Sequence, residues 1–198
     1  NAAENQIAVT DVNASDVDTS DTLTYSLTGG ADQSLFDVDS STGALTFKTT
    51  PNFETPSSSL SSNVYVVEVT VTDDGEGTLT ATRTIPVTVT DVNEAPVITS
   101  DGGGATASVN AAENQVAVTT VEADDEDLSD TLTYSLTGGA DQSLFDVNSS
   151  TGVLTFRSAP DFEANGSAAG NNTYIVEVNA TDDGTVVMTD VQTITIEV

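Results

Sequence analysis

The sequence predicts an all-β protein composed of two tandem β-sandwiches of immunoglobulin-like kind. Three observations support this prediction: the chain of 198 residues repeats itself, apolar and polar residues alternate along short runs, and turn-forming residues separate the runs. Alternation with a period of two is typical of strands that bury one face. About seven such strands per 100 residues, without a helical stripe of apolar residues, favour an antiparallel sandwich.

The repeat divides the chain into two similar halves. The segment "NAAENQ" begins at Asn1 and again at Asn110, and "SDTLTYSLTGGADQSLFDV" begins at Ser20 and at Ser129. The offset is 109 residues throughout, so self-similarity indicates two copies of one domain. We expect a first domain over 1–90 with a truncated opening strand, a linker over 91–96 and a second domain over 97–198. We also expect the pair to be cut from a longer array.

The first strands follow in chain order. An alternation runs through Leu23, Tyr25 and Leu27 and ends at the turn signal "TGG". A second runs through Leu45 and Phe47, directly after the turn signal "SSTG". Threonine, valine, isoleucine and tyrosine suit pleated surfaces. We therefore expect strands here, with their apolar side chains facing a core.

The longest alternation is "VYVVEVTVTD", which begins at Val64. One face carries Tyr65, Val67, Val69 and Val71, whereas the residues between them are mostly polar. The second copy repeats this pattern at the same offset. We expect the face that begins with Tyr65 to point inward in the first domain.

The last strand of the first copy runs through Ile85, Val87 and Val89, after the turn signal "DDG". Pro86 interrupts this run. Because proline has no N–H to donate to a neighbouring strand, we expect Pro86 to lie at an edge or a bulge.

The charge of the chain excludes several classes of partner. It has 32 Asp and Glu, 3 Lys and Arg and no His, which give a formal net charge of -29. Such a chain repels nucleic acid and anionic lipid and attracts cations. It also lacks cysteine, which excludes disulfides and thiolate metal sites. No apolar run of about 18 residues is present, so we expect no membrane insertion in this segment.

The acids gather in short motifs around the connection between the copies. These motifs are "AENQ" with Glu4, "PNFE" with Glu54, "DVNEAP" with Asp91 and Glu94, "ADDED" with Asp125 and Asp127, and "NATDDG" with Asp182. The loops of a sandwich cluster at its two ends, so motifs that are far apart in sequence can meet at one end. The connector is therefore where these carboxylates can converge.

Convergence of these carboxylates requires a cation. Two like charges 4 Å apart repel by about 4 kcal/mol at the effective dielectric constant of a protein surface. Several such pairs would cost as much as the whole stability of a domain, roughly 5–15 kcal/mol. Oxygen ligands without sulfur or imidazole select a hard cation such as Ca²⁺, whereas Mg²⁺ requires a tighter octahedron. The alternative is that each acid is a solvated loop residue, as in most charge runs.

Taken in order, the motifs resemble the cadherin repeat. The order is "AEN", an A-x-D-x-D element leading into "YSL", then "FDVDSSTG", "PNFE", "VEVTVTDDG" and "VTDVNEAP". The resemblance covers both copies. It implies two seven-stranded Greek-key sandwiches placed end to end, with calcium ions at the junction.

The resemblance also implies a set of calcium ligands. Those at the junction are Glu4, Glu54, Asp91, Asn93, Glu94, Asp125, Asp127 and Asp182 by side chains, Asn52 by a neutral side-chain oxygen, and Val92 and Ala95 by backbone carbonyls. Weaker half-sites are Asp16, Asp18 and Asp73 in the first copy and Glu113, Asp161 and Glu163 in the second.

Three departures bear on the number of ions. Asn52 stands where the family usually has Asp, Glu94 is one methylene longer than the usual Asp, and Ala95 replaces an Asn. The family holds three ions at each junction, and the charge lost at Asn52 leaves two as the alternative.

We therefore expect a calcium-binding tandem repeat of an extracellular or cell-surface location. It would be a spacer or adhesion segment of a large surface or secreted protein, with neighbouring repeats, a cell-surface protein or a polysaccharide as partners. Its richness in Thr, Ser, Ala and Asp is similar to that of cadherin-like repeats in large bacterial surface proteins.

Two other classes of function are alternatives to a spacer or adhesion segment. One is a module that binds carbohydrate or another repeat, which the absence of Trp disfavours. The other is an enzyme with paired carboxylates, such as a glycoside hydrolase. We expect no enzyme, because the acids match calcium motifs and the chain has no His or Cys to form a nucleophile–base pair.

Overall fold

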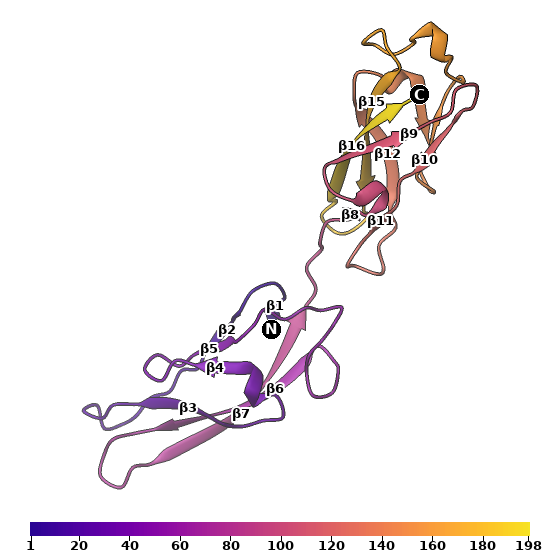
Figure 1. Cartoon of the computed structure of the whole chain (residues 1–198). Helices are drawn as coiled ribbons and strands as arrows, with labels where there is room; N and C mark the ends of the chain where they lie inside the picture. Colours follow the sequence, from indigo (N-terminus) through magenta and orange to yellow (C-terminus); the bar gives the residue numbers. More distant parts are fainter. The chain divides into compact units, whose positions relative to one another are not determined.

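The computed structural model describes all residues, 1–198, and contains two compact units, Asn1–Val92 and Asn93–Val198. Figure 1 shows the first unit in indigo to magenta and the second in pink to yellow, each composed of strands joined by loops. The division between Val92 and Asn93 lies inside the expected linker over 91–96.

The first unit has seven strands in two sheets. One sheet has the order β1-β7-β6-β3 and the other the order β2-β5-β4. The parallel pair is β1 with β7, and the other neighbours are antiparallel. The strands are β1 (Ala2–Ala3), β2 (Ala8–Asp11), β3 (Thr24–Gly29), β4 (Phe36–Val38), β5 (Ala44–Phe47), β6 (Val64–Thr72) and β7 (Thr80–Thr90), with a 3-10 turn η1 (Gln33–Leu35) before β4.

The second unit repeats this arrangement. Its sheets have the orders β12-β15-β16-β9 and β10-β14-β13, and a small extra sheet pairs β11 with β8. Its strands are β8 (Val97–Ile98), β9 (Thr106–Asn110), β10 (Ala117–Thr120), β11 (Ala123–Asp124), β12 (Thr133–Gly138), β13 (Phe145–Val147), β14 (Val153–Phe156), β15 (Thr173–Thr181) and β16 (Thr189–Glu197), and its 3-10 turns are η2 (Ser100–Gly102), η3 (Gln142–Leu144) and η4 (Phe162–Ala164). Two tandem seven-stranded sandwiches are therefore confirmed, and the β8–β11 pair is an addition that the sequence did not indicate.

The predicted inward faces are confirmed by burial. Tyr65, Val67 and Val69 of β6 are at most 1% exposed. Two phenylalanines from the opposite sheet, Phe36 and Phe47, pack against Tyr65 with ring centroids 6.3 and 5.2 Å away, both edge-on. The second unit has the same three rings at the same offset. Edge-to-face packing of this kind stabilises a core beyond the area that it buries, so these rings join the two sheets of each sandwich.

Pro86 lies in β7 opposite Val66 of β6. On its other side, β7 is paired with β1 only at Val89 and Thr90. At the corresponding position of the second unit, Thr195 is paired with Ser108 of β9, so the edge position of Pro86 stays a prediction.

A buried aspartate in each unit ties a long loop to the sandwich. In the second unit, Asp141 is 3% exposed, and its carboxylate accepts hydrogen bonds from the backbone N–H groups of Ala168 (2.6 Å) and Ile175 (2.8 Å). Asp32 makes the equivalent contacts to Ser59 and Val66 in the first unit. Charge-assisted bonds to buried N–H groups are strong, so this aspartate holds the loop that precedes β15.

We predict that Asp141→Ala lowers the free energy of unfolding of the second unit by about 2 kcal/mol or more. The substitution leaves two buried N–H groups without an acceptor, and each costs about 1–3 kcal/mol. Calorimetry in calcium-free buffer measures the effect. Asp146→Ala, at an exposed carboxylate, is the control and should change stability by less than about 1 kcal/mol. Equal losses in the two variants would contradict this role for Asp141.

Candidate metal centre

One group of carboxylates lies at the end of the first unit that precedes the linker. Glu4, Glu54 and Asp91 have carboxylate oxygens within 4.8 Å of one another. Asn5 adopts a left-handed backbone with φ of 59°, which asparagine tolerates better than most residues. The N–H of Glu4 donates to Thr90 O at 3.1 Å. The "AEN" motif is thus a turn that directs Glu4 inward.

Glu4 organises this group through backbone hydrogen bonds. It is 2% exposed, and its Oε2 and Oε1 accept from the N–H groups of Phe53 (2.8 Å) and Val92 (2.9 Å). Two loops that are distant in sequence are therefore held by one carboxylate. These two hydrogen bonds fix the position of the Glu4 carboxylate beside Glu54 and Asp91.

Asn52 is half-buried beside this group. Its Oδ1 accepts hydrogen bonds from Thr55 N (2.5 Å) and Thr55 Oγ1 (2.7 Å). The oxygen that the sequence proposes as a neutral ligand is therefore engaged within its own turn. It would have to exchange these contacts to bind an ion.

A second group of carboxylates lies at the end of the second unit that follows the linker. Asp127 and Asp182 are 6% and 3% exposed. Asp127 Oδ2 accepts from Glu94 N at 2.8 Å, and Asp182 Oδ2 accepts from Asn93 Nδ2 at 3.1 Å. The linker residues predicted as ligands therefore contact the predicted carboxylates of the same unit.

Asp125 gives this group an unsatisfied oxygen. Its Oδ1 accepts from Asp127 N at 3.0 Å, whereas its Oδ2 is buried and has no hydrogen-bond partner. Burial raises the pKa of Asp125 above its ordinary value, and the charges of Asp127 and Asp182 raise it further. Buried polar atoms normally have partners, so a cation fits this position.

Asp130 belongs to the same group and was missed by sequence reasoning. Its Oδ2 is buried without a hydrogen-bond partner. Its pKa is raised above the ordinary value, first by desolvation and then by the charges of four neighbouring aspartates, the nearest in sequence being Asp127. The spacing D-x-D-x-x-D, which begins at Asp125 and recurs from Asp16, is the sequence signal that could have found it.

The remaining ligands predicted for the linker are backbone groups. Val92 and Ala95 are exposed, and the adjoining Pro96 is buried. The N–H of Val92 donates to Glu4 and the N–H of Glu94 donates to Asp127. Each end of the linker is therefore attached by its main chain to the carboxylate group of its own unit.

The predicted half-sites also gather. Glu113, Asp161 and Glu163 have carboxylate oxygens within 4.8 Å of one another, and all three are exposed. Asp16 and Asp18 form a similar cluster, which is completed by Asp21 rather than by Asp73. The carboxylate of Asp73 instead accepts from its own loop.

The basic residues do not neutralise these groups. Lys48 Nζ lies 3.8 Å from Asp37, and Arg157 lies 3.0 Å from Asp146. The donors of the two groups at the linker are all oxygens on a chain without His or Cys. This donor set fits Ca²⁺, which takes 6–8 oxygen ligands.

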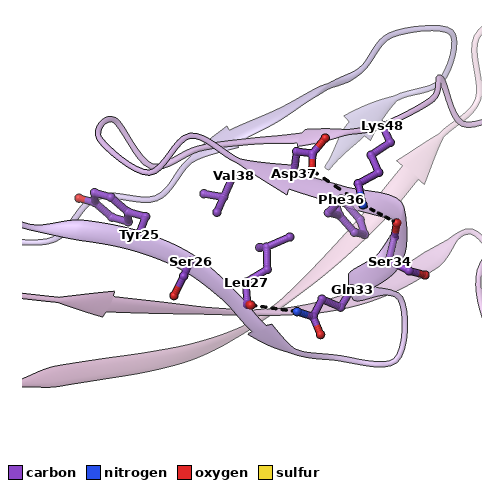
Figure 2. Close-up of a pocket in the computed structure, with 9 residues that line it drawn as sticks. All are labelled: Tyr25, Ser26, Leu27, Gln33, Ser34, Phe36, Asp37, Val38 and Lys48. Atoms are coloured by element: carbon purple, nitrogen blue, oxygen red, sulfur yellow. Dashed lines mark hydrogen bonds and ion pairs between the residues drawn. The ribbon is translucent and has the colours of Figure 1, made fainter.

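A shallow hollow in the first unit was considered as a binding site for carbohydrate. It has a volume of about 440 Å³. Figure 2 shows Gln33 and Lys48 at its rim with their amino groups directed to the backbone oxygens of Leu27 and Ser34, both at 2.9 Å. Phe36 is fully buried, so its ring offers no stacking surface for a sugar.

Comparison with known proteins identifies the family. The cadherin domain model matches residues 106–198. Rat protocadherin Fat 2 is 32% identical over 163 residues, which are 81% of this chain and 3% of that protein. Human protocadherin Fat 1 is 30% identical over 186 residues, which are 92% of this chain and 4% of that protein. The chain thus spans only 3–4% of the length of these two relatives.

Solved structures show the same fold. Drosophila N-cadherin EC1-4 matches 96% of this chain and 45% of that chain, with a TM-score of 0.64 and 20% identity. Human protocadherin-24 EC1-2 matches 99% and 91%, with a TM-score of 0.60 and 20% identity. The cis-dimer structure of protocadherin gammaB7 EC3-6 matches 89% and 40%, with a TM-score of 0.53 and 25% identity.

No helix of the structure has the length and apolar character needed to cross a bilayer. Residues 106–198 match the cadherin model, and residues 1–89 repeat the second unit without a gap. Both units have the sheet orders described above. The chain therefore belongs to the cadherin family, as two tandem cadherin repeats.

Proposed function

We propose that this chain is a calcium-rigidified spacer or adhesion segment of an extracellular or cell-surface protein. The observation that carries the proposal is the pair of carboxylate groups on either side of the linker, one of which contains the unsatisfied Oδ2 of Asp125. The carboxylates of such a group repel one another, and a bound cation would offset this repulsion.

The covalent chain supports a shared calcium site. Asp91 belongs to the group of the first unit and Asn93 to that of the second, with a single residue between them. Consecutive Cα atoms are about 3.8 Å apart, so these two residues are separated by no more than about 8 Å. This short covalent connection is compatible with the proposal that ions are shared between the two groups.

The proposed ligands divide according to the unit that positions them. Glu4, Glu54 and Asp91 would hold the ions nearest the first unit, and Asp125, Asp127 and Asp182 those nearest the second. The linker would add the side chains of Asn93 and Glu94 and the carbonyls of Val92 and Ala95. Two or three ions would bind, depending on whether Asn52 gives up its contacts with Thr55.

Calcium would supply the positive charge that the chain lacks. With the ions bound, both carboxylate groups and the linker share ligands, so the connection between the units becomes stiff. Without them, the repulsion among the carboxylates favours separation. The role proposed is mechanical rather than catalytic.

Other repeats are the proposed partners. A stiff connection sets the direction in which a following repeat continues, as an array of adhesive domains requires. The protocadherin gammaB7 structure is a cis-dimer, which supports repeats of this kind as lateral partners as well.

We predict that the full chain binds calcium with dissociation constants of about 10⁻⁴–10⁻³ M, as is usual for extracellular modules. Asp127→Ala should remove at least one ion from the isothermal titration, because Asp127 is buried and oriented by the linker. Asp124→Ala, at an exposed residue beside the group, is the control for the loss of one charge. A titration that is unchanged in Asp127→Ala would refute the proposed site.

We predict that calcium changes the flexibility of the chain without changing the fold of either unit. Small-angle scattering in millimolar calcium should give a narrower distribution of end-to-end lengths than scattering in excess EGTA. Circular dichroism should show the same strand content in both conditions. Identical scattering with and without calcium would be incompatible with rigidification.

We predict that Asp125 makes the calcium-free stability of the second unit depend on pH. Its pKa is raised in the folded protein, so folding takes up protons there, and the free energy of unfolding in EGTA should fall as pH rises above about 4 through the raised pKa. Asp125→Asn should remove this part of the slope. The measurement is chemical denaturation of both proteins across pH 3.5–7. If the free energy of unfolding has the same slope against pH in both, Asp125 does not contribute to it.

A further inference from the structure

We infer that Asp130 is a further ligand of the cation held by the second unit, and this inference rests on the proposed calcium function. Asp130 lies outside the ligand set that the sequence motifs imply. The unit would therefore provide one more anionic oxygen than its motifs alone indicate, and Asp21 would do the same in the first unit.

Asp130 faces a small space next to Gly184. Its Oδ2 lies 2.7 Å from the point that a Cβ at Gly184 would occupy, and Asn93 Oδ1 lies still closer to that point. Any side chain at this position would collide with both oxygens. The absence of a side chain at Gly184 therefore lets both oxygens lie against its backbone, close to one another.

The hydrogen bonds of Asn93 show which atom of its amide lies toward Asp130. Its Nδ2 donates to Glu94 O (2.9 Å), Asp182 Oδ2 (3.1 Å) and Val186 O (3.2 Å). Because all three partners are acceptors, the amide cannot be reversed, and its Oδ1 must face Asp130. An amide oxygen and a carboxylate oxygen repel one another unless a cation or a donor lies between them.

The Asp130 carboxylate makes few hydrogen bonds within the protein. Ser129 Oγ reaches its Oδ1 at 3.5 Å, whereas its Oδ2 is buried with no hydrogen-bond partner. The adjacent turn is held by another residue, since Asp183 Oδ1 accepts from Thr131 N at 2.7 Å. A buried oxygen that has no hydrogen-bond partner and does not stabilise the turn is suited to bind a cation.

The first unit provides an independent example of the arrangement. Carboxylate oxygens of Asp16, Asp18 and Asp21 lie within 4.8 Å of one another. Gly75, which corresponds to Gly184, faces Asp21 Oδ2. The same third aspartate and the same glycine therefore meet in both units, although two of the three residues between the aspartates differ.

The test compares calcium titrations of the full chain and three variants. Asp130→Asn keeps the shape of the side chain and removes its charge, and Asp124→Asn removes one charge at an exposed neighbour. Asp127→Ala reports on the proposed calcium site itself. Calcium-free stability of each variant, measured by calorimetry in EGTA, separates loss of a ligand from damage to the fold.

We expect Asp130→Asn to weaken the binding of one ion by about tenfold or more, and Asp124→Asn to weaken it by less than about threefold. In EGTA, Asp130→Asn should be at least as stable as the parent chain, because the substitution relieves repulsion. If Asp130→Asn titrates like Asp124→Asn while Asp127→Ala loses an ion, the role of Asp130 is refuted and the calcium function stands. If the parent chain itself binds no calcium, both are refuted.

Discussion

Mutual repulsion among carboxylates that the backbone holds close together is the constraint on which the functional regions of this protein depend. Glu4 cannot move freely away from the other carboxylates of its own unit, and the same holds for Asp127, because each is buried and accepts hydrogen bonds from main-chain N–H groups. The chain has 3 basic residues against 32 acidic ones, so it cannot neutralise such groups itself. This excess of negative charge supports the proposal that a cation binds the two groups beside the linker.

The sandwiches provide the rigidity that keeps these groups together. Aromatic rings such as Phe145 and Tyr174 join the sheets across the core, and Asp141 attaches the long loop before β15. The ligand loops begin and end on strands that this packing fixes. Hydrophobic burial thereby stabilises an arrangement of charges that would otherwise spread apart.

The duplication within the chain shows which features of each end are shared and which vary. Both units have an aspartate pair, a third aspartate and a facing glycine at one end. At the opposite end, Asn52 of the first unit corresponds to Asp161 of the second. Exchange of one acid for an amide lowers the charge of a group by one, and Thr55 uses the amide oxygen that results. Under the proposed calcium function, such exchanges would change the number and affinity of the ions at a junction.

The sequence by itself determined the sandwich fold and the inward faces of strands such as β6, because these follow from period-two burial. Its acidic motifs also named most members of both carboxylate groups, although that assignment as ligands stays a prediction. Only the tertiary structure decided that Asp130 faces Gly184 and that Asp141 is a buried hydrogen-bond acceptor, since both depend on contacts between residues far apart in the chain. The sequence records the spacing of carboxylates, but not whether each carboxylate oxygen has a hydrogen-bond donor. Asp141 has donors and holds a loop, whereas Asp130 Oδ2 has no partner.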